Sequence, residues 1–201
     1  MIHRPQDDFD PREPTRASSP AFNAEGRLAR ALQIDSPNHD SRPEGAIVSL
    51  LVLHNISLPP GEFGGRGVFD LFLNRLDPHA HPYYLGLRGL EVSSHFFIRR
   101  DGQLIQLVPC ERRAWHAGVS QWRGRERCND FSIGVELEGS DETAFTDAQY
   151  VELARLTQEL RARYPIQDVA GHAEIAPGRK TDPGPCFDWA RYRSLIAELS
   201  T

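Results

Sequence analysis

The clearest hydrophobic segment of the chain is Ala46–His54, which reads AIVSLLVLH. A nearly continuous series of aliphatic and β-branched residues is typical of a strand that is buried on both faces of a sheet. The segment ends in His54 and Asn55. We therefore expect these two polar side chains to lie at an edge of a central sheet.

Other apolar stretches predict further strands. Residues 92–99 and 103–108 flank Arg100, Asp101 and Gly102, and an Asp-Gly pair between two β-rich stretches favours a hairpin. Residues 131–137 (FSIGVEL) predict another strand, and residues 167–171 predict a short one.

Helical signals are strongest in the second half of the chain. Thr146 and Gln149 have the spacing of a capping box, apolar residues follow at helical intervals, and Pro165 ends the pattern. Residues 187–199 predict a last helix with an apolar side. Residues 68–76 favour a short helix, and residues 24–32 show a weak helical pattern.

This order of elements predicts an α/β fold, with a mixed central β-sheet flanked by helices. Residues 1–24 are polar and rich in proline, so we expect a disordered N-terminal extension followed by one domain over residues 25–201. Residues 57–91 lack a strand pattern, and such a long insertion in a compact domain is often functional.

Composition limits the partners and the compartment. The 201 residues carry a formal net charge of -5 without a basic cluster, which argues against nucleic acid or an anionic membrane as a partner. The first twenty residues lack the apolar region of a signal peptide. The three cysteines show no disulfide or metal spacing. We therefore expect a cytoplasmic protein with reduced thiols.

Candidate chemistry concentrates in Gly171–Pro185, which reads GHAEIAPGRKTDPGP. Three prolines and three glycines stiffen this segment, and it carries His172, Lys180 and Asp182. A catalytic zinc site needs three protein ligands and an open position, and His54 at the end of its buried strand supplies a third donor. The pattern predicts one Zn²⁺ at an edge of the sheet, although two imidazoles and a carboxylate also suit Fe(II) or Co(II). Alternatively, His54 is an ordinary strand-end residue and His172 a hydrogen-bonding loop residue.

Glu136 lies within the apolar strand at residues 131–137. An unpaired buried carboxylate either costs several kcal/mol or has a raised pKa, so this side chain is expected to be paired or functional. A raised pKa suits a general base beside an activated water. The alternative is a buried salt bridge, with Lys180 or Arg127 as the partner.

Several longer motifs together resemble the AmpD-type N-acetylmuramoyl-L-alanine amidases over roughly residues 25–195. These motifs are His54-Asn55, Ala114–Gly118 (AWHAG), Gly124–Gly134 (GRERCNDFSIG), Glu136–Gly139 (ELEG) and Gly171–Pro185. The resemblance implies a zinc amidase fold related to phage amidase lysozymes and peptidoglycan recognition proteins. It implies cleavage of the amide between (1,6-anhydro)-N-acetylmuramic acid and L-alanine, with a soluble anhydromuropeptide of peptidoglycan recycling as the substrate.

The resemblance also implies roles for individual residues. His54, His172 and Asp182 would bind zinc, Glu136 would act as acid and base, and Lys180 would stabilise the oxyanion. Three further residues are candidates for substrate binding: Trp115 by stacking on a sugar, Asn55 by hydrogen bonding and Arg127 by pairing with a carboxylate of the stem peptide. A packing role for Trp115 and a surface ion pair for Arg127 are the alternatives.

Two other functions remain open from the sequence alone. One is a muropeptide-binding module without turnover, and the other is an amidase that acts on the polymeric cell wall. His79 and His81 have the spacing of a metal-binding pair, but no carboxylate ligand or stiff turn accompanies them. We interpret them as solvent-exposed loop residues, and we interpret His95 as a hydrogen-bonded strand residue.

Overall fold

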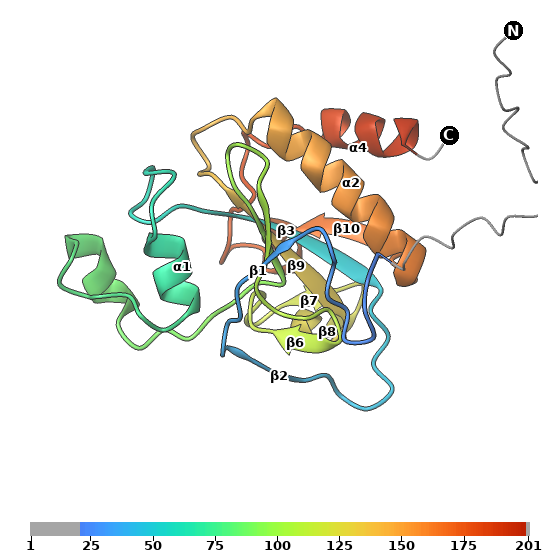
Figure 1. The fold of residues 1–201 in the computed structure, drawn as a ribbon, viewed down its shortest axis with the longest axis horizontal. Helices are drawn as coiled ribbons and strands as arrows, with labels where there is room; N and C mark the ends of the chain where they lie inside the picture. Colours follow the sequence, from blue (N-terminus) through green and yellow to red (C-terminus); the bar gives the residue numbers. More distant parts are fainter. Residues whose placement is uncertain (1–20, 200–201) are drawn as a thin grey trace, which may run out of the picture.

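A six-stranded mixed sheet forms the centre of the computed structural model, which describes residues 21–199 (Figure 1). In spatial order the strands are β1 (Leu32–Gln33), β5 (Leu104–Gln106), β4 (Phe96–Ile98), β9 (Ser132–Glu138), β3 (Leu50–Ile56) and β10 (Asp168–Gly171). Only β4 and β5 pair antiparallel in this sheet, as the two strands of the predicted hairpin. The other neighbours are parallel, so β3, β9 and β10 end at the same edge.

Two small antiparallel pairs and several helices surround this sheet. The pairs are β2 (His39–Ser41) with β6 (Arg112–Ala114), and β7 (Gln121–Trp122) with β8 (Arg125–Glu126). The helices are α1 (Gly67–Phe72), η1 (Pro82–Leu87), η2 (Cys128–Asp130), α2 (Asp147–Arg163), α3 (His172–Ile175) and α4 (Trp189–Glu198). The predicted mixed sheet with flanking helices is confirmed. No helix within residues 21–199 is long and apolar enough to cross a membrane.

The main hydrophobic core lies between the sheet and the pair of helices α2 and α4, which lie together in Figure 1. Side chains alternate along a strand, so Ile133, Val135 and Leu137 of β9 enter this core. Ser132, Gly134 and Glu136 therefore point to the opposite face. That second face of β9 is polar, although it too is buried.

The helix α2 begins where the capping box predicts it. The Thr146 hydroxyl accepts a hydrogen bond from the backbone N–H of Gln149, and the Gln149 side chain accepts one from the N–H of Thr146. Two N–H groups that the first turn leaves without helical partners are thereby satisfied. The predicted strand at 131–137 and the helices near 68–76 and 187–199 are also present, with ends shifted by a few residues.

Two local predictions are wrong. The strand predicted at residues 46–54 is β3, which spans Leu50–Ile56 instead, because its partner β9 begins only at Ser132 and pairs there with Leu50. Residues 24–32 form no helix. The backbone N–H of Leu28 donates instead to the side chain of Gln106, 2.8 Å away, and Leu28 bridges to Phe22.

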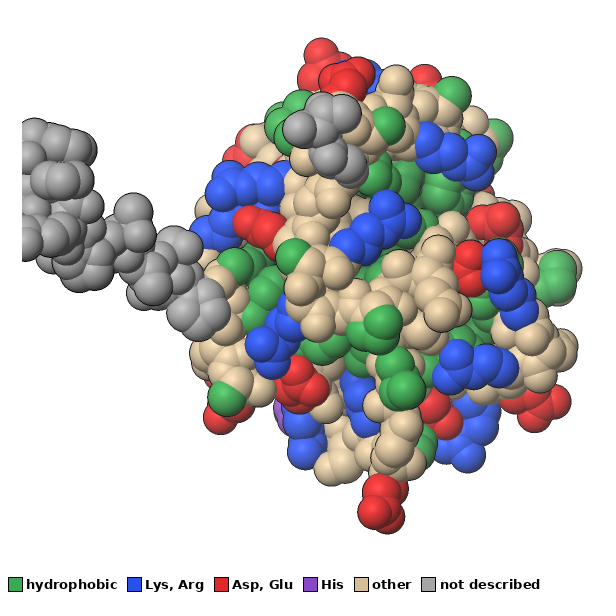
Figure 2. Space-filling model, turned by 90° about the vertical axis from the view of Figure 1, so that its right-hand side faces the viewer, with side chains coloured by type: hydrophobic (Ala, Val, Ile, Leu, Met, Phe, Trp, Pro, Cys, Tyr) green, Lys and Arg blue, Asp and Glu red, His purple; other side chains and the backbone are tan. Residues whose placement is uncertain are grey.

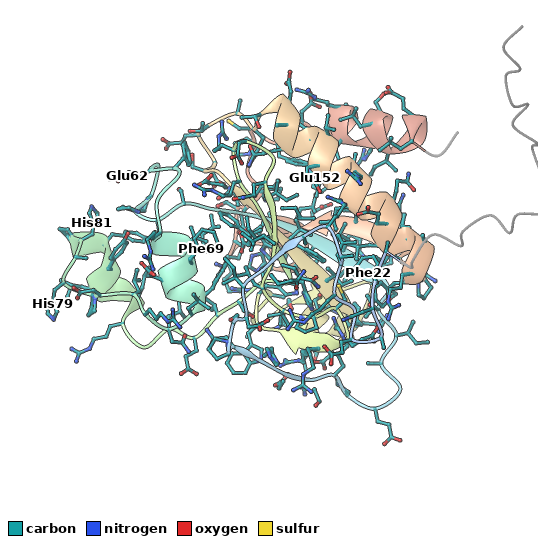
Figure 3. The ribbon with its side chains drawn as sticks, in the orientation of Figure 1. Phe22, Glu62, Phe69, His79, His81 and Glu152 are labelled. Atoms are coloured by element: carbon teal, nitrogen blue, oxygen red, sulfur yellow. The ribbon has the colours of Figure 1, made fainter. Side chains whose placement is uncertain are left out.

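The packed fold also begins earlier than residue 25. Phe22 is buried in the main core and packs edge-on against Tyr164, with ring centroids 6.3 Å apart (Figure 3). The last four residues assigned to the extension therefore belong to the domain. Residues 1–20 of the predicted extension lie outside the described residues.

The long segment between β3 and β4 forms a lobe beside the sheet, built from α1 and η1 (Figure 1). Phe69 of α1 lies against Phe97 of β4, with ring centroids 5.5 Å apart. His79 and His81 lie at the outer end of this lobe (Figure 3). His79 is exposed and His81 half-buried, and the metal-ligand group found among the described residues does not include them.

We expect the substitution Phe22→Ala to lower the free energy of unfolding by about 3 kcal/mol, because it removes a buried aromatic ring from the core. Urea denaturation measures this change. Leu85→Ala is the matched control, since Leu85 is 56% exposed and its loss should cost less than about 0.5 kcal/mol. Equal stability of the Phe22→Ala variant and the wild type would place Phe22 outside the core.

Candidate metal centre

The parallel strands β3, β9 and β10 bring their polar residues to one edge of the sheet. Open sheets of this kind bind ligands beyond the carboxyl ends of their parallel strands. His54 of β3 lies directly opposite Glu136 of β9 in the strand register. Gly171, the last residue of β10, pairs with Leu53, so His172 follows immediately beside His54. Strand pairing alone therefore brings the two histidines and Glu136 together.

Asp182 joins the histidines through the loop that follows α3. The backbone N–H of Ala173 donates to the carbonyl of Asp182, 2.9 Å away, which fastens the end of this loop to its beginning. A Cβ atom on Gly171 would lie 2.8 Å from the ring of Pro183, so glycine is needed for this close approach. This hydrogen bond and this close approach position the loop against the end of β10.

Three donor atoms form a small triangle at this point. His54 Nδ1 lies 2.9 Å from His172 Nδ1, and Asp182 Oδ2 lies 3.0 Å from each of them. The edge of a tetrahedral zinc site with bonds of 2.0–2.1 Å is about 3.4 Å, so a small expansion of the triangle suffices for the ion. These three residues are also the group of possible metal ligands found among residues 21–199.

The proton positions in this triangle favour a cation. His172 Nε2 lies 3.1 Å from the carbonyl oxygen of Ala117, which can only accept, so the neutral ring carries its proton on Nε2. The Nδ1 lone pair of His172 then faces Asp182. Burial lowers the pKa of His54 to about 4, which keeps that ring neutral near pH 7. Converging lone pairs of this kind suit a metal ion.

Glu136 is buried next to this triangle without a counter-ion. Its Oε2 atom has no hydrogen-bond partner, and no residue within 21–199 forms an ion pair with it. Burial raises the pKa of Glu136 well above its ordinary value, the charge of Asp182 adds to this, and Lys180 opposes it. The alternative of a buried salt bridge to Lys180 or Arg127 is therefore wrong. A raised pKa and a free oxygen atom are what a general base requires.

A cavity of about 650 Å³ opens over these groups, which is within the usual size of a small-molecule site. The residues of the predicted site that line it are His54, Asn55, Trp115, Glu136, His172, Lys180 and Asp182. Lys180 is exposed, whereas Trp115 is half-buried. Leucines of the α1–η1 lobe form an apolar wall opposite these polar groups, among them Leu58, Leu87 and Leu90.

Two of the residues proposed for substrate binding have partners within the protein. The Asn55 amide donates to Asp141 Oδ1 at 2.7 Å and to the Pro183 carbonyl at 3.0 Å, so it fastens two loops to the edge of β3. Arg127 is 70% exposed and pairs with Asp130, 3.2 Å away, which is the surface ion pair considered as the alternative. It lines a neighbouring hollow and not the cavity above Glu136.

Some residues behind the candidate metal ligands were not predicted from the sequence. His116 Nδ1 lies 3.0 Å from His54 Nε2, and Arg179 donates to the carbonyl oxygens of Ala117 and Val119 at 2.7 Å. The signal available in the sequence was strand alternation. It places Ser132 and Gly134, which lie against His116, on the same face as Glu136. His95 is buried beside β4 and accepts the backbone N–H of Gly134 at 3.0 Å, so its predicted hydrogen bonding is confirmed.

Comparisons with a family model, with sequences and with solved structures all match this chain to N-acetylmuramoyl-L-alanine amidases. Residues 45–185 match the model of the N-acetylmuramoyl-L-alanine amidase family. The chain is 58% identical over 178 residues to the 1,6-anhydro-N-acetylmuramyl-L-alanine amidase AmpD of Citrobacter freundii, covering 88% of this chain and 95% of the relative. It is similar to a crystal structure of a selenomethionine derivative of AmpD, with a TM-score of 0.85, 59% identity and coverage of 87% and 98%.

A more distant structure is a complex of the N-acetylmuramyl-L-alanine amidase AmiD from Escherichia coli with the substrate anhydro-N-acetylmuramic acid-L-Ala-D-γ-Glu-L-Lys. Its TM-score is 0.56 and its identity 32%, and the match covers 77% of this chain and 60% of that chain. The similarity to AmpD therefore extends over 87–88% of this chain, whereas the similarity to AmiD covers 60% of that protein.

In metal-free protein we expect Glu136→Gln to raise the free energy of unfolding at pH 7. The raised pKa of folded Glu136 means that the wild type loses stability as the pH rises above about 4.3, the ordinary value of an unfolded glutamate. Glutamine has no such penalty, so the difference should vanish below about pH 4.

Urea denaturation over a pH series measures this difference. Glu142→Gln at the exposed rim of the same cavity is the control and should change little. If the Glu136→Gln variant is no more stable than the wild type at pH 7, Glu136 ionises without a burial penalty.

Proposed function

Because the chain belongs to the AmpD-type N-acetylmuramoyl-L-alanine amidases, we propose that it is a zinc enzyme that hydrolyses the amide between (1,6-anhydro)-N-acetylmuramic acid and L-alanine. Membership of this family makes it an N-acetylmuramoyl-L-alanine amidase that acts in peptidoglycan recycling. Zinc dependence and a cytoplasmic location are the further parts of the proposal. The observation that carries it is the unpaired, buried Glu136 beside a triangle of two imidazoles and one carboxylate.

The residues present fit a zinc ion. His54 and His172 would bind it through Nδ1 and Asp182 through Oδ2, which leaves a fourth position for water or substrate. Two neutral ligands and one carboxylate leave the bound ion positively charged. When bound, zinc supplies a Lewis acid that lowers the pKa of water and polarises a carbonyl group.

Glu136 acts as the base and then as the acid. It accepts a proton from the attacking water while the water oxygen bonds to the lactyl carbonyl carbon. It then returns that proton to the nitrogen of L-alanine as the carbon–nitrogen bond breaks, which gives a carboxylic acid and a free amine. The acid then loses its own proton to the amine or to solvent. Its raised pKa suits the first transfer, because a carboxylate with a raised pKa is a stronger base than an ordinary one.

Lys180 stabilises the charge that develops on the carbonyl oxygen. It lines the cavity above Glu136, and its positive charge influences both Glu136 and His54. An ammonium group next to the oxygen atom that becomes negative stabilises the transition state more than the neutral substrate, and it therefore lowers the barrier. Lys180 follows Arg179, whose hydrogen bonds to Ala117 and Val119 anchor this part of the loop.

The substrate is proposed to be a soluble anhydromuropeptide. The cavity combines an apolar wall from the α1–η1 lobe with the polar groups at the sheet edge, and this combination suits a sugar ring joined to a peptide. The AmiD complex contains such a ligand. Trp115 would stack on the sugar. The roles of Asn55 and Arg127 in substrate binding stay predictions, since the amide of Asn55 already binds Asp141 and Arg127 lies outside the cavity.

A cytoplasmic location and the absence of a nucleic-acid partner complete the proposal. Cys110, Cys128 and Cys186 are all free thiols, as expected in a reducing compartment. Basic and acidic side chains are interspersed on the face shown in Figure 2, which does not resemble the continuous basic surface that nucleic acid requires. Cell fractionation tests the location.

Purified protein loaded with zinc should release stem peptide from an anhydromuropeptide, and a chelator should abolish this until zinc is restored. Glu136→Gln should retain zinc and lower kcat by about 10²- to 10⁴-fold, because the proton transfers are lost. Glu142→Gln at the cavity rim is the control. Release of stem peptide by the metal-free protein would contradict zinc dependence. Turnover of Glu136→Gln near the wild-type rate would contradict the role of Glu136. Faster release from intact sacculi than from the soluble anhydromuropeptide would contradict the proposed substrate.

Asp182→Ala should weaken zinc retention, because it removes the one charged ligand of the site. Metal analysis after dialysis against a weak chelator measures the loss, with Glu142→Ala as the control. Full retention of zinc by Asp182→Ala would remove Asp182 from the ligand set.

A further inference from the structure

The Nε2 atoms of both candidate zinc-binding histidines contact the same dipeptide, His116–Ala117. His54 Nε2 contacts His116 Nδ1 at 3.0 Å, and His172 Nε2 contacts the carbonyl oxygen of Ala117 at 3.1 Å. We propose that the dipeptide His116–Ala117, held in place by Asn129, is the support that positions both histidines for the metal. This inference rests on the proposed zinc site, and it assigns positioning roles to His116 and Asn129.

Asn129 fixes the backbone of the dipeptide through two hydrogen bonds. Its Oδ1 atom accepts the backbone N–H groups of both His116, at 3.2 Å, and Ala117, at 2.8 Å. Asn129 is buried in η2, and Arg42 donates to its backbone carbonyl at 3.1 Å. Because η2 leads directly into β9, Asn129 and the catalytic Glu136 belong to one continuous piece of the chain.

The hydrogen bonds that join His54, His116 and Ser132 agree with metal binding through His54 Nδ1 in one donor–acceptor direction. If His54 binds a metal through Nδ1, its proton lies on Nε2 and is donated to His116 Nδ1. The proton of His116 is then on Nε2, 3.2 Å from Ser132 Oγ, which can accept it. Outer partners of this kind set the tautomer and the orientation of a metal-binding histidine.

The structure also makes room for the His116 ring. A Cβ atom on Gly134 would lie 2.6 Å from Cγ and 2.7 Å from Nδ1 of that ring. Any larger residue at this position of β9 must therefore displace His116. Arg179 adds a second hydrogen bond to the Ala117 carbonyl, at 2.7 Å, which fixes the partner of His172 from the solvent side.

His116 itself is not placed as a ligand. Its Nδ1 atom is directed at the far side of the His54 ring, at Nε2, and its Nε2 atom at Ser132. The group of possible ligands found among residues 21–199 contains only His54, His172 and Asp182. The role that remains for this buried imidazole is to orient His54.

The test is the zinc affinity of purified variants, measured by competition with a chromophoric chelator, together with kcat and KM. Asn129→Leu and His116→Phe should weaken zinc binding by about 10- to 100-fold, which is the usual cost of losing an outer partner. Gly134→Ala should weaken it in the same direction. Asn129→Asp, which keeps the accepting oxygen, should restore most of the affinity. The loss in turnover at saturating zinc should appear in kcat more than in KM.

Thr157→Val controls for lost stability, because Thr157 lies on the buried side of α2, where its hydroxyl contacts Tyr192 of α4 at 2.7 Å, away from the metal centre. It should lower the melting temperature without changing zinc affinity. Wild-type affinity in folded Asn129→Leu and Gly134→Ala variants would overturn the inference, even if His116→Phe does not fold. If the wild type itself binds no zinc, the proposed zinc site fails, which is a different outcome.

Discussion

The parallel, in-register pairing of β3 with β9 is the constraint on which the site depends. It places His54 opposite Glu136 on the face of the sheet that is turned away from α2. A slip of one residue would exchange the faces of a strand and would move His54 into the apolar core. The register is strongly fixed, because Leu51 and Leu53 of β3 and Ile133 and Val135 of β9 fill the core on the other side. Hydrophobic packing under α2 therefore determines the geometry of a polar site on the opposite face.

The site is electrostatically unfavourable without a ligand, and the rest of the fold compensates for this. Glu136 is buried with one oxygen atom unpaired, and two imidazole nitrogens converge on a carboxylate. Such arrangements are common in active sites, where stability is sacrificed for chemistry. The surrounding groups hold this arrangement in place: Asn55 fastens the Pro183 loop, Asn129 fastens the His116–Ala117 dipeptide, and the strand ladder fixes Glu136.

The sequence carried enough information to group the three candidate metal ligands and to predict most of the sheet. Strand patterns ended in His54 and enclosed Glu136, and the stiff loop after residue 171 carried the remaining donors. Features that depend on tertiary contacts were not predictable in this way. The start of β3 depends on where β9 begins, and the loss of the expected helix at 24–32 depends on a side chain of β5, Gln106. Arg127 was a candidate by motif alone, but its place is set by its pairing with Asp130.

X-ray absorption at the zinc edge of the loaded protein tests the proposed ligand set. We expect four light ligands, of which two are imidazoles, one is the carboxylate of Asp182 and one is water. A third imidazole would mean that His116 binds the metal and does not support His54. A sulfur ligand would mean that a cysteine replaces one of the three proposed residues. Either result would contradict the assignment of His54, His172 and Asp182 as the complete protein ligand set.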